Sequence, residues 1–185
     1  GAIVTAPKYF SVTTITSEKS EEKFEDIALL KAVQLKSEND QINLSKVSHG
    51  LRKKVVFGLI PVKVYALQFF LQNPGKLNKS DDQVLASLKE AGPLHLSFTF
   101  LRDLSGSKIS DSFKEGLEAN KINLKTMPLE LDQILKEISG IKEFKKGETF
   151  SATAVWNDNQ ESLYLQYPNG ELKAFTGSGG FVEQF

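Results

Sequence analysis

The chain has 185 residues, 23 basic and 23 acidic side chains, and no cysteine. The balanced charge provides no overall field to gather nucleic acid, the lack of cysteine excludes thiol catalysis, disulfides and cysteine metal sites, and no apolar run is long enough to cross a membrane. We therefore expect one domain with a substantial core that does not span a membrane and binds no nucleic acid.

The first 27 residues are interpreted as a loose N-terminal arm. Residues 13–26 (TTITSEKSEEKFED) are highly charged and offer only Ile15 and Phe24 for burial, so we expect no ordered core element there. The chain begins GAIVTAPKYF, with neither a starting Met nor a signal-type apolar segment, as a mature chain whose leader has been removed would begin. The folded domain is expected over residues 28–185.

From residue 28 onward the pattern predicts strands separated by turns. LLKAVQL and INLSKV flank a turn at SENDQ, and two apolar strands follow near 50–58 and 62–71. Turn residues between Leu-rich and β-branched runs are typical of hairpins. Pro61 cannot donate a hydrogen bond to a neighbouring strand, so it marks the bend or an edge.

A short helix and a strand are predicted next. Ser80-Asp81-Asp82-Gln83 has the spacing of a capping box and predicts a helix over about 81–90. Residues 93–102 (PLHLSFTFLR) alternate apolar and polar side chains at period two, the pattern of a strand with one buried face.

Two amphipathic helices follow. Ile109, Phe113 and Leu117 form one stripe at helical spacing, and four apolar residues within 131–138 form a second stripe after a possible cap at Thr126. Each stripe needs an apolar surface to pack against.

The last third is predicted to be a β-meander. The strands GETFSATAVW, ESLYLQY and ELKAFTG are separated by turns, and the second turn carries Asn169-Gly170, a strong hairpin signal. Strands, then helices, then strands again predict an α+β fold, a large antiparallel sheet with helices on one face.

Motifs for metals, cofactors and common catalytic chemistry are absent from the sequence. His49 and His95 have no second ligand at helical spacing, so we expect no metal site. GSGG at 177–180 lacks the Lys and Ser or Thr of a phosphate loop. We therefore expect no cofactor and assign no catalytic residue.

Arg52 and Tyr65 are the polar pair that the hairpin geometry singles out. If Arg52 pairs opposite Leu67, then Arg52 and Tyr65 lie diagonally on one face and can grip a carboxylate together. If Arg52 pairs opposite Gln68, the two side chains point to opposite faces. The structural alternative is an Arg that reaches to water and a Tyr that is a half-buried wedge.

Three stretches resemble chalcone isomerase-like proteins. GLRKKVVFGLIPVKVYALQFFL is similar to their first long strands, LSFTFLRDLSGSKISDSFKEGLEAN to their central strand and following helix, and YPNGELKAFTGSGGFVEQF to their closing hairpin and last helix. The resemblance spans roughly residues 28–185. It implies an open-faced β-sandwich with a ligand cleft between sheet and helices, and a last helix that continues beyond Phe185.

The resemblance carries over only part of the isomerase active site. The family's strand Arg matches Arg52 and its helix Asn matches Asn120. The strand Thr position is Tyr65, the helix Tyr position is Phe113 and the helix Lys position is Gly116. Without that hydroxyl and that charge the acid–base and electrostatic parts of the chemistry are missing, so flavonoid isomerase activity is not expected.

Arg52 followed by Tyr65 is instead similar to the pair that grips a carboxylate in plant fatty-acid-binding proteins of the same fold. The first hypothesis is therefore a non-catalytic binder of an apolar carboxylate such as a fatty acid. Its ligand-binding residues are Arg52, Tyr65, Asn120, Phe69, Phe98, Phe100 and Phe113. The thirteen Phe residues of the chain suit either an apolar cavity or an ordinary core.

Two alternatives remain open. One is an isomerase or intramolecular lyase with an altered site built on Arg52, Tyr65 and Asn120. The other is an exported structural or interaction protein that binds no ligand. The resemblance to bacterial members that carry a secretion leader implies a periplasmic or secreted location, whereas the composition is equally compatible with the cytoplasm.

Overall fold

The protein, represented by a computed structural model, is described at residues 10–56, 58, 60–78, 84–119, 129–157 and 160–177. The described strands form one antiparallel sheet, ordered from β1 to β8 as in the sequence. These strands are β1 (Thr14–Phe24), β2 (Ile27–Lys36), β3 (Gln41–Val56), β4 (Ile60–Leu71), β5 (Leu94–Phe100), β6 (Thr149–Asn157), β7 (Gln160–Gln166) and β8 (Leu172–Gly177). The helices are α1 (Val84–Ala91), α2 (Gly106–Ala119) and α3 (Leu129–Ser139), with a 3-10 turn at Pro74–Lys76.

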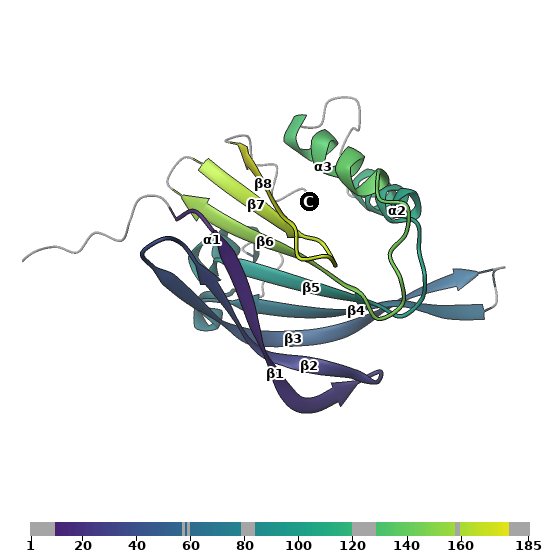
Figure 1. The fold of residues 1–185 in the computed structure, drawn as a ribbon, viewed down its shortest axis with the longest axis horizontal. Helices are drawn as coiled ribbons and strands as arrows, with labels where there is room; N and C mark the ends of the chain where they lie inside the picture. Colours follow the sequence, from purple (N-terminus) through teal and green to yellow (C-terminus); the bar gives the residue numbers. More distant parts are fainter. Residues whose placement is uncertain are drawn as a thin grey trace, which may run out of the picture.

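The sheet curls into a half-barrel (Figure 1). Val33 of β2, Val155 of β6 and Tyr164 of β7 share one apolar cluster although several strands separate them in the sheet. We call this the inner cluster; its buried members are Phe10, Val12, Val33, Leu35, Leu44, Phe70, Val155 and Tyr164. Strands far apart in the sheet meet because each buries one apolar face against the other.

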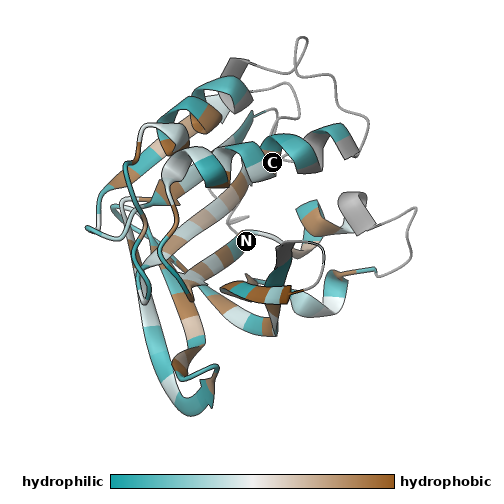
Figure 2. Cartoon of the chain, turned by 90° about the vertical axis from the view of Figure 1, so that its right-hand side faces the viewer, coloured by the Kyte–Doolittle hydropathy of each residue, from teal (hydrophilic) through white to brown (hydrophobic). Residues whose placement is uncertain are grey.

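A second cluster, the helix-side cluster, occupies the opposite face of β4 to β7. Ile134 and Ile138 of α3 pack there against sheet residues such as Phe98 and Phe150, and Ile109 and Phe113 of α2 pack at its margin. Figures 1 and 2 show α2 and α3 together on this side of the sheet. These four residues of the predicted amphipathic stripes therefore face the sheet. The helices cover part of this face, which is less than the full layer that the sequence predicted.

The prediction of a loose N-terminal arm is wrong for the described residues. Residues 14–24 form β1 and pair with β2, and Phe10 and Val12 are buried in the inner cluster. The backbone N–H of Phe10 donates to Asn157 Oδ1 at 2.9 Å. β1 is an edge strand with two irregularities in its pairing, and charged side chains are common on such edges because they discourage pairing with other chains.

Most other predicted elements are confirmed with adjusted ends. β5 matches the alternating strand, α2 and α3 match the two stripes, and β6 to β8 form the meander. The turn before β8 has Gly170 at a φ of 89°, a left-handed conformation that glycine adopts without strain. The strands predicted at 42–47 (INLSKV) and near 50–58 are one continuous strand, β3.

Several predictions lie outside the described residues. They are the capping box at 80–83, the cap at Thr126, Asn120, and most of GSGG with the helix expected after it.

Candidate functional site

The β3–β4 hairpin places Arg52 directly opposite Tyr65. Neither register considered from the sequence is correct, because Gly50 pairs with Leu67 and His49 with Gln68. Residues directly opposite each other in an antiparallel pair point to the same face. The structure therefore brings Arg52 and Tyr65 closer than the diagonal arrangement would have done.

The pairing shifts immediately after this point. Lys53 pairs with Lys63, so β4 has one more residue than β3 between the two pairs. An irregularity of this kind bends and twists a hairpin locally and often redirects side chains next to binding sites. The sequence carries no glycine or proline at this bulge, so nothing in the pattern predicted it.

Tyr65 lies on the helix side of the sheet. Its ring contacts the Phe98 ring edge-on, with centroids 5.3 Å apart, and it packs against the helix-side cluster. Burial raises the pKa of the Tyr65 hydroxyl, and the positive charge of Arg52 opposes that rise. At neutral pH the phenol is therefore protonated and can donate a hydrogen bond.

Arg52 is exposed beside this phenol, and within the described part of the chain its guanidinium has no ion pair. A guanidinium can donate two parallel hydrogen bonds to a carboxylate. The Tyr65 hydroxyl supplies a further donor on the same face. Arg52 and Tyr65, at the margin of the apolar helix-side surface, can thus bind one carboxylate together.

Gly50 leaves space on that surface. It precedes Arg52 by two residues on β3, so the two positions share a face, and a Cβ built at Gly50 would meet no atom within 4 Å. Glycine inside a strand often marks a place where a ligand or another backbone approaches closely. The open space at Gly50 lies beside Arg52 along β3 and opposite Leu67 of β4, which in turn pairs with Phe98 of β5.

The predicted aromatic residues fall into two groups. Phe98 and Phe100 are 7% and 3% exposed, and their rings contact Phe150 and Phe144 respectively. They are therefore buried members of the helix-side cluster and form the floor of the proposed site. Phe69 and Phe113 are half-buried. Phe113 packs at the margin of the helix-side cluster from α2, and Phe69 lies on the face of Tyr65 by alternation along β4. Nothing is described at Asn120.

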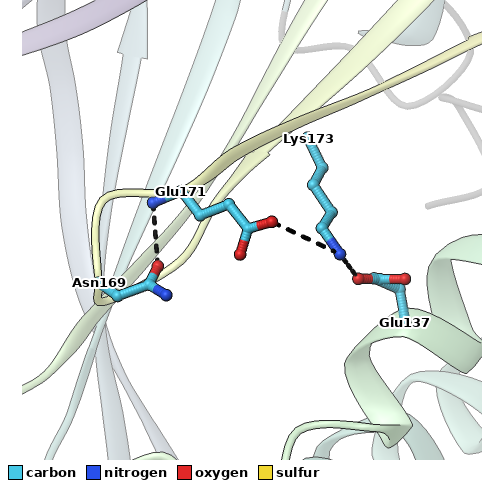
Figure 3. Close-up of polar contacts among 4 residues, drawn as sticks. All are labelled: Glu137, Asn169, Glu171 and Lys173. Atoms are coloured by element: carbon cyan, nitrogen blue, oxygen red, sulfur yellow. Dashed lines mark hydrogen bonds and ion pairs between the residues drawn. The ribbon is translucent and has the colours of Figure 1, made fainter.

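The sequence analysis did not predict a pocket that lies between the C-terminal end of α3 and the turn before β8. It measures about 230 Å³ and is lined in part by Glu137, Phe144, Tyr167, Glu171 and Lys173. Lys173 bridges Glu137 of α3 and Glu171 (Figure 3), with 3.8 Å between Lys173 Nζ and Glu171 Oε1. Lys173 therefore already neutralises the two glutamates that line this pocket, and its ion pair with Glu137 links β8 to α3. The sequence placed these residues in separate elements and gave no signal of their meeting.

The buried hydroxyl of Tyr167 is notable beside this pocket. Among the described residues it has no hydrogen-bond partner. Burial, with a smaller contribution from the charge of Glu171, raises the pKa of Tyr167 to about 12. Lys173 Nζ lies 5.6 Å from the centroid of the Tyr167 ring, a favourable place for a cation.

His95 is a core residue. It is 3% exposed, its Nδ1 lies 2.7 Å from Thr153 Oγ1, and burial lowers its pKa from 6.5 to about 4. Among the described residues no group of three or more His, Asp or Glu side chains could hold a metal ion. No described helix is long and apolar enough to cross a membrane.

Comparison with known proteins supports the fold. No family model and no curated protein matches the sequence. The crystal structure of a fatty-acid binding protein from Arabidopsis thaliana has the same fold, with a TM-score of 0.58 and 14% sequence identity, over 90% of this chain and 85% of that chain. This likeness confirms the chalcone isomerase-like fold that the sequence resemblance implied, and at such low identity it shows the fold alone.

Proposed function

We propose that this protein is a non-catalytic binder of an apolar carboxylate such as a fatty acid. The observation that carries the proposal is the direct pairing of Arg52 with Tyr65 on the helix-side face. Two donors of different kinds at one point, one permanently charged and one protonated at neutral pH, suit a carboxylate better than a neutral polar group.

The apolar body of the ligand extends from this pair over Gly50, where the strand has no side chain to obstruct it. From there it meets Phe98 and the half-buried Phe69 and Phe113. Phe100 supports the floor through its contact with Phe144. Asn120 completes the proposed set as a polar group following α2. Burial of a hydrocarbon chain against such a surface provides most of the binding free energy.

The shared fold with a protein named for fatty-acid binding supports this ligand class. Phe113 and Gly116 stand where the resemblance to the isomerases expects a hydroxyl and a positive charge, which supports binding without turnover. Turnover of chalcone-like substrates by the purified protein would contradict the non-catalytic assignment and favour the altered isomerase.

Calorimetric titration with dodecanoate and with dodecanol tests the proposal. We expect the wild-type protein to bind the acid more tightly than the alcohol, and Arg52→Ala to remove most of that preference. Arg102→Ala is the matched control, since Arg102 is the other arginine of the chain, is also exposed and is not one of the proposed ligand-binding residues. Failure of the wild type to bind dodecanoate, or equal loss in both variants, would refute the proposal and favour a protein without a ligand.

A further inference from the structure

The β3–β4 hairpin concentrates positive charge in a chain whose net charge is zero. Between Asp40 and Asp81 there is no Asp or Glu, whereas seven residues are Lys or Arg. Three of these lysines, Lys53, Lys54 and Lys63, lie in the outer half of the hairpin. The balanced overall composition hides this local imbalance.

The lysines surround the hairpin instead of lying on one side. Lys53 and Lys54 are neighbours on β3, so they point to opposite faces, and Lys53 pairs directly with Lys63. Like charges placed opposite each other destabilise a strand pair. Lys63 forms an ion pair with Glu25 at 2.6 Å, but within the described residues neither Lys53 nor Lys54 has an acidic partner. A binding partner with an anionic surface would neutralise these two lysines.

Beyond the lysines the hairpin becomes apolar. From Val55 to Val62 the sequence contains no charged or side-chain hydrogen-bonding residue. Ile60 is 56% exposed and is the one large apolar side chain, among the residues described, that is found exposed; the neighbouring Pro61 is exposed too. Figure 1 shows this end of the hairpin reaching past the helices and past the rest of the sheet.

We propose that this hairpin end docks on an anionic lipid surface. The exposed Ile60 and Pro61 lie near the protruding end of the hairpin, and the lysines lie behind them. This order matches a membrane, where acyl chains lie beneath charged headgroups. A nucleic acid would satisfy the lysines but offers no apolar layer for Ile60, and the lipid surface accounts for both. The inference stands independently of the carboxylate site, because it uses neither Arg52 nor Tyr65.

Flotation with lipid vesicles tests this docking. The wild type is expected to float with phosphatidylcholine vesicles that contain phosphatidylglycerol and to remain behind with phosphatidylcholine alone. Because each lysine near an anionic surface strengthens binding about fivefold, Lys53→Ala/Lys54→Ala is expected to weaken it about 25-fold. Added salt weakens wild-type binding as well, since it screens the headgroup charge.

Two further variants distinguish a docking surface from general attraction. Lys145→Ala/Lys146→Ala is the matched control, because those lysines are also adjacent and exposed, and it is expected to bind vesicles like the wild type. Ile60→Ser is expected to weaken vesicle binding about fivefold while leaving its salt dependence in place. Thermal unfolding checks that each variant is folded.

Three results would overturn the inference. They are no flotation of the folded wild type with anionic vesicles, equal losses in the two lysine variants, and an Ile60→Ser variant that binds as well as the wild type. Binding to a short oligonucleotide without binding to vesicles would assign the lysines to nucleic acid and overturn it as well.

Discussion

Arg52 of β3 and Tyr65 of β4 face each other across one strand pair, with Gly50 two residues before the Arg. A guanidinium, a phenol and an open patch of strand surface therefore occur together at the margin of the helix-side cluster. The fold is shared with a fatty-acid binding protein, but the ligand proposal depends on these three positions.

Filling the space at Gly50 is expected to block the ligand without harming the fold. In Gly50→Leu the new side chain enters a region where a Cβ meets nothing within 4 Å, so the midpoint of thermal unfolding should be unchanged or slightly raised. Dodecanoate affinity should fall at least tenfold, because the acyl chain loses its path. Calorimetry measures the affinity. Gly75→Leu, at another open glycine far along the chain, should bind like the wild type; equal affinity in both variants would exclude this path.

The fold was predictable from the sequence to a greater extent than the site. Period-two alternation in β5, the stripes of α2 and α3 and the Asn169-Gly170 turn each report local burial or local backbone conformation, and the structure confirms them. β1 was missed because an edge strand with charged side chains lacks the apolar alternation of a core strand. Alternation in the sequence reveals a strand only when one face of it is buried, and no side chain of β1 is fully buried.

The register of the hairpin could not be read from the sequence. Its pairing shifts between Arg52 and Lys53, and a bulge of this kind depends on how the whole sheet twists. One of the two registers considered put Arg52 and Tyr65 on one face, and they do lie on one face, but in a third register. The pocket beside Tyr167 depends on contacts between α3 and the last hairpin, which local patterns do not encode.

The buried His95 is expected to make stability depend on pH. Its pKa falls from 6.5 to about 4 in the folded protein, so between those values the unfolded chain binds the extra proton and the free energy of unfolding rises with pH. Over the whole interval the effect is at most about 3 kcal/mol. Urea unfolding from pH 5 to pH 6.5 should show this rise in the wild type.

His95→Gln should flatten that rise, whereas His49→Gln, at the other histidine of the chain, should retain it. Identical pH dependence in the wild type and in His95→Gln would contradict the assignment of the effect to this residue.

Gly106 is expected to tolerate no side chain. A Cβ there would lie 2.2 Å from the backbone oxygen of Ile138 and 2.3 Å from that of Ile141, so α2 and the end of α3 would have to move apart. Gly106→Ala should lower the free energy of unfolding by about 1–3 kcal/mol, measured by urea unfolding. Gly140→Ala is the control, because its Cβ would meet backbone oxygens at 3.5 Å. Equal stability of the two variants would show that the helices do not pack this closely.

A double-mutant cycle on dodecanoate binding tests the central claim most directly. If Arg52 and Tyr65 hold one carboxylate, Arg52→Ala and Tyr65→Phe should each weaken binding by about 1–3 kcal/mol, and the double variant should lose less than the sum of the two by at least about 0.5 kcal/mol. Dodecanol binding should be nearly the same in all four proteins. Strictly additive losses, or losses that are as large for dodecanol as for dodecanoate, would contradict the claim.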